Sequence, residues 1–303
     1  MNHIEELFTE HFEPGYFKLI DRTHPLSLYI GADNDGHYAI EYRGDFNPIK
    51  VKSSTAIGVM HYVIDTKKSL VFSLLDSSML STFCAFCEDM VETSRSATDN
   101  NSGYTMLVNR FYGWKKMFHQ SKDLLDEKRI MGLIGELLFL EQKMIPLCGK
   151  SKALSSWTGS EKTKKDFSLD DTWYEVKTIT AGKPVVGISS YEQLDSDLLG
   201  NLVVYQLEKM SQEYNGINLN KLVKRIYKEL DVDELKDVFL QKLTDAGYSF
   251  ESAYDSYVYE IYAESIYEVN QSFPCLRREE RLDAISQVKY DLLLAKIEKY
   301  KIK

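Results

Sequence analysis

The sequence predicts an α/β (α+β) fold in which helices flank a mixed β-sheet and a β-rich domain precedes that sheet. The first observation is that, from Pro25 to about Leu75, short runs of β-branched and aromatic residues alternate with turn residues, as in consecutive strands. The second is a helical pattern over Asp126–Met144 that is apolar around most of its circumference. Such a helix must be buried against another layer, and β runs follow it, so we expect it to cover a sheet.

The composition agrees with a two-part globular chain. The 303 residues are 44% hydrophobic and 27% charged, which is ordinary for a globular protein. We place an N-terminal β-rich accessory domain at residues 1–100 and the main domain at residues 101–303, with a helical insertion at about 217–247. The boundary falls in Ser94–Tyr104, a polar segment with Gly and paired Asn that is typical of a linker.

The N-terminal domain is expected to begin with an amphipathic helix within residues 1–20. The turn Asp33–Gly36 joins the first two strands as a hairpin; it resembles a calcium loop, but no Glu follows at the required offset, so turn formation is preferred. A helix over Met79–Thr93 follows, and its Cys84 and Cys87 are interpreted as buried thiols because nothing nearby completes a metal site. The strands are expected at Leu26–Ile30, Tyr38–Tyr42, Gly58–Val63 and Ser69–Leu75.

The main domain opens with two helices, at Val108–His119 and Asp126–Met144, and continues with β runs. We expect a short helical connection at Ser189–Leu199, and two helices with charged outer faces as the insertion. Val288–Leu294 fits a strand or a helix, and we favour the strand. The other strands are expected at Ala153–Trp157, Lys165–Leu169, Trp173–Ile179, Val185–Ile188, Leu202–Leu207 and Tyr257–Val269, and the insertion helices at Leu219–Leu230 and Val232–Ala246.

The net charge of −9 argues against a protein coated in basic surface for nucleic acid. The stretch 143–183 is nevertheless locally basic, with eight Lys against five acidic residues. Within it, Lys162, Lys164 and Lys165 form either a solvated loop or a basic lip for a phosphate-rich substrate. No apolar run approaches the roughly 20 residues that span a bilayer, and the N-terminus has no signal-peptide pattern, so we expect a cytoplasmic protein.

Asp166, Glu175 and Lys177 form the most informative pattern in the chain. Glu175 and Lys177 alternate along the expected strand Trp173–Ile179 and therefore share one of its faces. If Phe167–Leu169 is the preceding strand and a turn follows it, Asp166 returns beside them. Two carboxylates and an amine can hold a hard cation and orient a water molecule, which points to phosphodiester chemistry. A structural salt bridge between Asp166 and Lys177 is the alternative.

Glu136 stands out as an acidic residue in the apolar helix Asp126–Met144. It either lies on a polar face toward water or joins the cluster of carboxylates. Gly132 and Gly135 lie beside it and permit close packing or the close approach of a ligand. The six histidines lie outside the expected strands of the main domain, which disfavours a histidine-based metal site.

A set of short motifs occurs in a fixed order along the chain: Phe83-x3-Cys87-x-Asp89, the helix stretch Gly132–Leu140, Trp157-x-Gly159, Asp166-Phe167, Glu175-Val176-Lys177-Thr178, Ile188–Leu194 and Phe273-Pro274. Together they resemble the PD-(D/E)xK nuclease superfamily, which has the restriction-endonuclease-like fold. More narrowly, the chain is similar to an uncharacterised bacterial family assigned to that superfamily, and the resemblance covers most of the chain. Lys165 stands where the superfamily's short name has Pro, a proline that is often missing.

The resemblance implies roles for individual residues. Asp166 and Glu175, together with the backbone carbonyl of Val176, would bind Mg²⁺ or Mn²⁺. Glu136 would serve a second metal ion or its water shell. Lys177 would orient the attacking water and stabilise negative charge in the transition state, so that Glu136, Asp166, Glu175 and Lys177 make up the implied catalytic set.

The function implied is a magnesium-dependent DNA endonuclease, a hydrolase of phosphodiester bonds in bacterial restriction or phage defence. The alternative is a non-catalytic nucleic-acid-binding or scaffolding subunit of a defence complex, which the acidic net charge favours and the complete set of Asp, Glu and Lys disfavours. The implied partner is DNA, with other defence-system subunits and a homodimer left open and no membrane contact; action on RNA is not distinguished. Gln193 is either a polar residue near the site or a solvent-facing side chain.

Overall fold

The computed structural model describes residues 3–8, 11–64, 67–119, 124–159, 165–277, 285 and 287–303. The chain forms two compact units, the first comprising Met1–Lys122 with Ser249–Glu251 and the second comprising Asp123–Tyr248 with Ser252–Lys303. The first unit thus runs past residue 100, where the sequence places the boundary. Helix α3, which begins in the segment expected to be a linker, packs on α2 inside this unit.

The start of α3 explains why a polar segment is helical here. The Asp99 carboxylate accepts hydrogen bonds from the backbone N–H groups of Asn101 and Ser102, at 2.8 and 2.9 Å. The Ser102 hydroxyl in turn accepts the N–H of Asp99 at 3.0 Å, which completes a capping box. Residues that resemble a linker are therefore the N-terminus of a helix, and the expectation of a loop over 94–104 is wrong from Asn100 onward.

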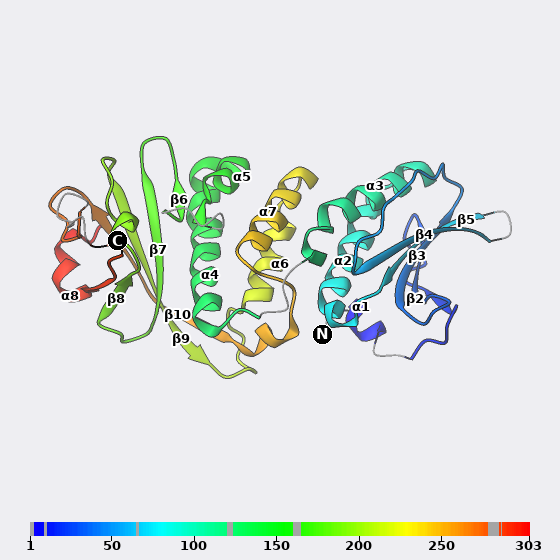
Figure 1. Cartoon of the computed structure of the whole chain (residues 1–303), viewed down its shortest axis with the longest axis horizontal. Helices are drawn as coiled ribbons and strands as arrows, with labels where there is room; N and C mark the ends of the chain where they lie inside the picture. The colour runs from blue at the N-terminus through cyan, green and yellow to red at the C-terminus, as the bar shows by residue number, and fades with distance from the viewer. Residues whose placement is uncertain are drawn as a thin grey trace. The chain divides into compact units, whose positions relative to one another are not determined.

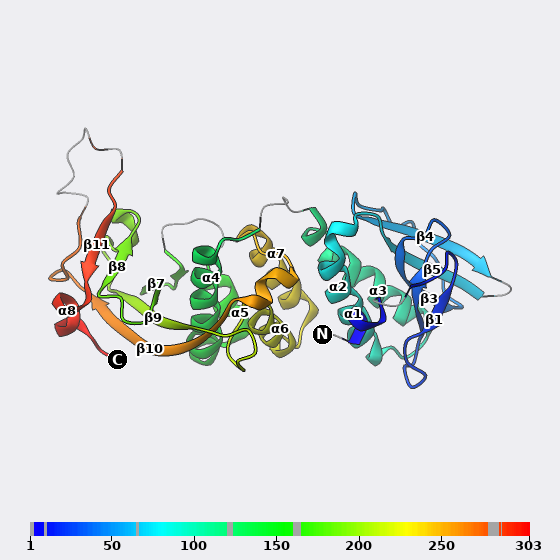
Figure 2. The same ribbon diagram turned by 90° about the horizontal axis from the view of Figure 1, so that it is seen from below.

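The first unit is a five-stranded antiparallel sheet in the order β1-β2-β3-β5-β4, with α2 and α3 on one face (Figure 2). The ring of Phe72 on β5 packs against Phe86 of α2 and Phe111 of α3, which fixes the buried face. The four predicted strands, the hairpin and the helix α2 are confirmed, and Cys84 and Cys87 are free, buried thiols. The elements are α1 (His3–Leu7), β1 (Phe17–Leu19), β2 (Ser27–Ala32), β3 (Tyr38–Gly44), β4 (Ile57–Ile64), β5 (Lys67–Leu74), α2 (Leu80–Thr93) and α3 (Asn100–Trp114).

The second unit contains these elements in chain order: α4 (Glu127–Phe139), a π-helical turn (Leu140–Met144), α5 (Ile145–Ser156), β6 (Phe167–Ser168), β7 (Trp173–Thr180), β8 (Val185–Ile188), β9 (Gly200–Met210), α6 (Leu219–Glu229), α7 (Asp233–Asp245), β10 (Val258–Val269), β11 (Tyr290–Leu293) and α8 (Leu294–Ile297). Its main sheet has the order β10-β9-β7-β6, with β7 parallel to β9 and the other pairs antiparallel. The predicted mixed sheet flanked by helices is confirmed.

Layers cover both faces of this sheet. Figure 1 shows α4 on one side of β7, and β8 with α8 on the other. Strand β11 pairs with β8 in a separate two-stranded sheet. Helices α6 and α7 of the predicted insertion pack on α4 and α5 respectively, and so form a further helical layer. The strand β7 therefore lies between two layers, and its uncovered edge opens between them.

Two expectations for the second unit are wrong. Ala153–Trp157 is not a strand: α5 continues to Ser156 after a kink at Gly149, where φ is 79°, and Pro146 lies in the first turn of this helix, where proline is tolerated. The expected helical connection Ser189–Leu199 contains only a 3₁₀ turn, at Tyr191–Gln193. The final strand is confirmed as β11. Among the described residues, we find no helix that combines the length and the apolar character needed to cross a membrane.

Candidate active site

Helix α4 approaches β7 closely at Gly135. A Cβ atom on this residue would lie 2.0 Å from the hydroxyl oxygen of Thr178 and 3.5 Å from a methyl carbon of Val176. One turn further along α4, the ring of Phe139 packs on Tyr174, with 4.9 Å between the centroids. Because side chains alternate along a strand, the even-numbered residues of β7 face α4. The glycine is what allows this close approach, and Glu136 follows it directly.

The odd-numbered residues of β7 face the opposite layer. Trp173 and Ile179 join a buried cluster with side chains of β8 and β9. Glu175 and Lys177 share this face, as the alternation predicts, and Lys177 Nζ donates to Glu175 Oε1 at 2.6 Å. The Glu175 side chain is only 1% exposed, so this ion pair lies beneath the surface.

Asp166 reaches β7 across an unpaired strand edge. Strand β6 pairs only with Trp173 and Tyr174, so no strand of the described residues pairs with this edge of β7 beyond them. There, Asp166 Oδ2 accepts the backbone N–H of Val176 at 2.8 Å. The backbone N–H and C=O of one strand residue point the same way, so the Val176 carbonyl also faces this edge. Asp166 is itself held by the N–H of Gly159, which donates to its carbonyl at 3.0 Å.

Glu136 lies beside Asp166. Its Oε2 accepts the indole N–H of Trp157 at 2.7 Å. A Cβ atom on Gly159 would lie 2.7 Å from Asp166 Oδ1 and 3.0 Å from this same Glu136 oxygen, so a glycine leaves a space between the two carboxylates. Glu136 is half-buried, and its carboxylate lies against the Trp157 indole and close to Asp166.

These groups line a cleft of about 690 Å³ between α4, the edge of β7, and the sheet of β8 and β11. Asp166, Glu136 and Lys177 lie in its wall, whereas the buried Glu175 does not. Three further lysines line the cleft and are exposed: Lys128 from α4, Lys183 from the turn after β7, and Lys289 from the residues before β11.

Lys165 is the one described residue among the three lysines that were expected to form a solvated loop or a basic lip. Lys162 and Lys164 lie outside the described residues, and Lys165 does not belong to a solvated loop. Its ammonium lies 3.6 Å from the ring centroid of Trp173 and donates to the backbone carbonyls of Gln193 and Asp195, at 2.8 and 3.2 Å. Burial lowers the pKa of Lys165 to about 8. This lysine ties the segment of Gln193 to the site, and Gln193 itself lines the cleft.

The electrostatics of the cluster reflect crowded negative charge with little water. Burial and the neighbouring Asp166 carboxylate raise the pKa of Glu136 to about 8. Burial likewise raises the pKa of Asp166, and it raises that of Glu175 well above its usual range. Burial disfavours the charged form of Lys177, but the carboxylates of Glu175 and Asp166 outweigh this effect and raise the pKa of Lys177.

The residues present fit a divalent cation. Glu175 Oε2 is buried and has no hydrogen-bond partner among the described residues, which is costly for a carboxylate oxygen. A cation held by Asp166, Glu175 and the Val176 carbonyl would satisfy this oxygen and relieve the mutual repulsion that raises the pKa of Glu136. The three carboxylates do not bring their oxygens within 4.8 Å of one another in this structure, where Lys177 holds Glu175.

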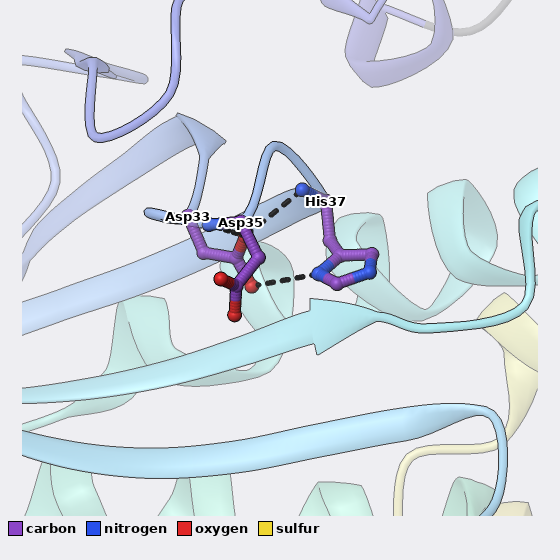
Figure 3. Close-up of side chains that lie close together, drawn as sticks. All are labelled: Asp33, Asp35 and His37. Atoms are coloured by element: carbon purple, nitrogen blue, oxygen red, sulfur yellow. Dashed lines mark hydrogen bonds and ion pairs between the residues drawn. The ribbon is translucent and has the colours of Figure 1, made fainter.

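The group among the described residues that does meet this distance lies elsewhere, at the hairpin of β2 and β3. Figure 3 shows Asp33, Asp35 and His37 close together there. Asp33 Oδ1 accepts the backbone N–H groups of Asp35 and His37, at 3.0 and 2.9 Å, and Oδ2 lies 3.3 Å from His37 Nδ1. These are the bonds of a turn whose Asp caps its own backbone, so the sequence-based interpretation as turn chemistry accounts for them.

Some residues at or behind the cleft were not predicted from the sequence. Trp157, which lies behind the cleft, was expected in a strand, and no local pattern indicated that its indole would donate to Glu136. A buried Trp N–H that needs an acceptor is the signal that could have identified this bond. Lys128 and Lys289 come from elements far apart along the chain, and no local pattern links them.

One comparison with known proteins, the match to a family, agrees with this architecture. Residues 7–295 match the DUF4420 family, whose description is "Putative PD-(D/E)XK family member". Neither the comparison with curated proteins nor that with solved structures returned a match. The family match covers nearly the whole chain and includes every element of the cleft. The chain therefore belongs to the DUF4420 family of PD-(D/E)XK proteins, with a nuclease-like mixed sheet at its centre.

Proposed function

We propose that the protein is a metal-dependent DNA endonuclease that hydrolyses phosphodiester bonds, acting in bacterial restriction or phage defence. The observation that carries the proposal is the meeting of Glu136, Asp166 and Lys177 at the open edge of β7, above a buried carboxylate of Glu175 that lacks a partner for one oxygen. Membership of a PD-(D/E)XK family supports nuclease chemistry at this edge.

The charge around the cleft supports a polyanionic substrate. Among the described residues, none of the ammonium groups of Lys128, Lys183 and Lys289 has a carboxylate partner, and all three side chains are exposed. On other surfaces of the same unit, lysines such as Lys143 and Lys209 are paired with Glu264 and Glu127. In a chain of net charge −9, unpaired cations at the cleft favour contact with phosphate groups there.

The protonation of Lys177 defines its part in the reaction. Because the pKa of Lys177 is raised, the amine carries a proton and is a poor general base. It acts instead as a hydrogen-bond donor and a positive charge beside the scissile phosphate. In the metal-free protein the pKa of Glu136, about 8, keeps this carboxyl mostly protonated at neutral pH. A bound cation would lower that pKa and leave a carboxylate that can accept a proton. The backbone N–H of Val176 donates to the Asp166 carboxylate and holds it in position.

A divalent cation bound by Asp166, Glu175 and the Val176 carbonyl would polarise the phosphate and lower the pKa of a bound water molecule. The water oxygen attacks phosphorus in line with the leaving 3′ oxygen. One P–O bond would form as the P–O3′ bond breaks, and the departing 3′ oxygen would take a proton from solvent, which gives a 5′-phosphate and a 3′-hydroxyl. Glu136 accepts the proton that the water loses, and Lys177 stabilises the added negative charge.

The test is a cleavage assay on supercoiled plasmid, linear duplex, single-stranded DNA and RNA, with Mg²⁺ or Mn²⁺. We expect metal-dependent nicking of DNA by the wild-type protein and its loss in Asp166→Asn and Lys177→Met. The matched control is Lys209→Met, which removes a lysine on β9 that is ion-paired with Glu127. Cleavage that survives both site substitutions would contradict the assigned centre. Tight DNA binding without cleavage by the wild type would favour the scaffolding alternative.

A further inference from the structure

Helix α7 of the insertion contacts Trp157 at two points. Lys242 Nζ donates to the backbone carbonyl of Trp157 at 2.6 Å. The ring of Phe239 packs beside the indole, with 6.2 Å between the centroids. Residues three apart on a helix lie on the same face, so one face of α7 holds both the backbone and the ring of Trp157.

Trp157 in turn connects α7 to the carboxylates of the cleft. Its indole N–H donates to Glu136 Oε2 at 2.7 Å. Two residues later, the N–H of Gly159 donates to the carbonyl of Asp166 at 3.0 Å. The indole is fully buried, so its position is set by the groups packed around it. A shift of Trp157 would therefore move the hydrogen bond that orients Glu136.

The burial of Lys242 indicates that its ammonium group has a role beyond packing. Its side chain is 6% exposed, and a buried ammonium costs free energy even when it is hydrogen-bonded. If this position served packing alone, an apolar side chain would fill it at lower cost. The lysine instead supplies a donor that reaches the carbonyl at the C-terminal end of α5, where the last carbonyls of a helix lack intrahelical partners.

The insertion is also anchored at α6. Arg225 Nε and Nη2 donate to the two carboxylate oxygens of Glu141, at 2.5 and 2.7 Å. Glu141 belongs to the π-helical turn that directly follows α4. Such a bidentate ion pair fixes the relative orientation of the two side chains as well as contributing to stability. The insertion is thus attached to the end of the helix that carries Glu136 and, through Lys242, to the residue that binds Glu136.

We propose that Lys242 is a positioning residue for the cleft: through the Trp157 carbonyl and indole, helix α7 of the insertion sets the orientation of the Glu136 carboxylate. The role of Glu136 in hydrolysis rests on the proposed function, whereas the link from Lys242 to Glu136 does not. Outer contacts of this kind typically change metal affinity or activity by about 10- to 100-fold when they are removed.

The experiment follows the indole N–H signal of Trp157 by ¹H–¹⁵N correlation in the full chain. The protein has three tryptophans, and Trp157→Phe assigns the signal. We expect Lys242→Met to shift it in the same direction as Glu136→Gln does. The control is Lys236→Met on the same helix, whose lysine pairs with Asp233 and which should leave the signal in place.

Mn²⁺ titration of the same variants completes the test. We expect Lys242→Met to weaken Mn²⁺ binding about tenfold or more and Lys242→Arg, which keeps a donor, to restore most of the affinity. A folded Lys242→Met protein with the wild-type indole signal, or with a shifted signal and unchanged Mn²⁺ affinity, would overturn the proposal. Should Lys242→Met not fold, Phe239→Leu tests the second contact of α7 by the same criteria. If the wild type cleaves no nucleic acid, the proposed function fails, and the indole signal still decides the positioning role.

Discussion

The close approach of α4 to β7 makes a quantitative prediction for two glycines of one helix. Gly132 and Gly135 both lie inside α4 and are three residues apart. A Cβ on Gly132 would meet no atom within 4 Å, whereas a Cβ on Gly135 would lie 2.0 Å from Thr178 Oγ1. Replacing either glycine with alanine changes the helix propensity by the same amount. The new methyl group has free space at position 132 and meets Thr178 at position 135.

The magnitudes follow from this difference. Replacing glycine by alanine inside a helix stabilises it by about 1 kcal/mol, so we expect Gly132→Ala to raise the free energy of unfolding by roughly that amount. Gly135→Ala has the same gain but adds a methyl group to a filled space, which costs about 1–3 kcal/mol. The difference between the two variants isolates the clash, and we expect Gly135→Ala to be the less stable by about 1–3 kcal/mol.

Urea unfolding, followed by circular dichroism and tryptophan fluorescence, measures this difference. The double variant Gly135→Ala with Thr178→Ala removes the hydroxyl that the new methyl would meet, and should recover most of the lost stability. Equal stability of Gly132→Ala and Gly135→Ala, or a double variant no more stable than Gly135→Ala, would refute the close packing of α4 on β7 that positions Glu136.

Three further predictions concern the carboxylates and the first unit. Gly159→Ala would place a methyl 2.7 Å from Asp166 Oδ1 and 3.0 Å from Glu136 Oε2, so we expect Mn²⁺ affinity to fall at least tenfold in calorimetry, with an unchanged circular dichroism spectrum. In metal-free protein, Glu136 binds its proton more tightly when folded, with its pKa raised from 4.5 to about 8; its contribution to stability should therefore decline as pH rises between these values. Urea unfolding of Glu136→Gln should show a stability advantage over wild type that grows across this range, and a constant difference would contradict the raised pKa. Asp89→Ala removes the buried carboxylate that accepts from Arg110 Nε at 2.8 Å and from the Trp114 indole N–H at 2.7 Å, which should cost about 3–5 kcal/mol in the first unit. Mn²⁺ affinity should stay at the wild-type value in that variant, and a loss of affinity would argue against a metal centre confined to the second unit.

Local patterns were enough to predict most of the strands. The runs now seen as β2 to β5 alternate clearly, and the hairpin at Asp33–Gly36 has the residues that its turn requires. The errors arose where a local pattern allows more than one structure. Ala153–Trp157 was expected to be a strand and instead forms the end of α5 and its C-cap, and Asp99 was expected in a linker and instead caps α3.

The candidate site was only partly accessible to sequence reasoning. Strand alternation correctly puts Glu175 and Lys177 on one face, because their spacing is local. The indole N–H at Glu136 and the lysines of the cleft depend on packing between segments far apart along the chain. Lys165 illustrates the difference: the lysine-rich local sequence suggested either a solvated loop or a basic lip, whereas packing against Trp173 gives this lysine a structural role.

The central claim is that the carboxylates at the edge of β7 form the metal centre. Titration calorimetry with Mn²⁺ tests it directly in the wild type, Asp166→Asn and Asp33→Asn. The last variant keeps the oxygen that caps the hairpin turn and removes one of the two carboxylates of the other cluster. We expect Asp166→Asn to abolish Mn²⁺ binding and Asp33→Asn to leave it at the wild-type affinity. Binding that survives in Asp166→Asn and is lost in Asp33→Asn would contradict the claim and move the metal to the hairpin of the first unit.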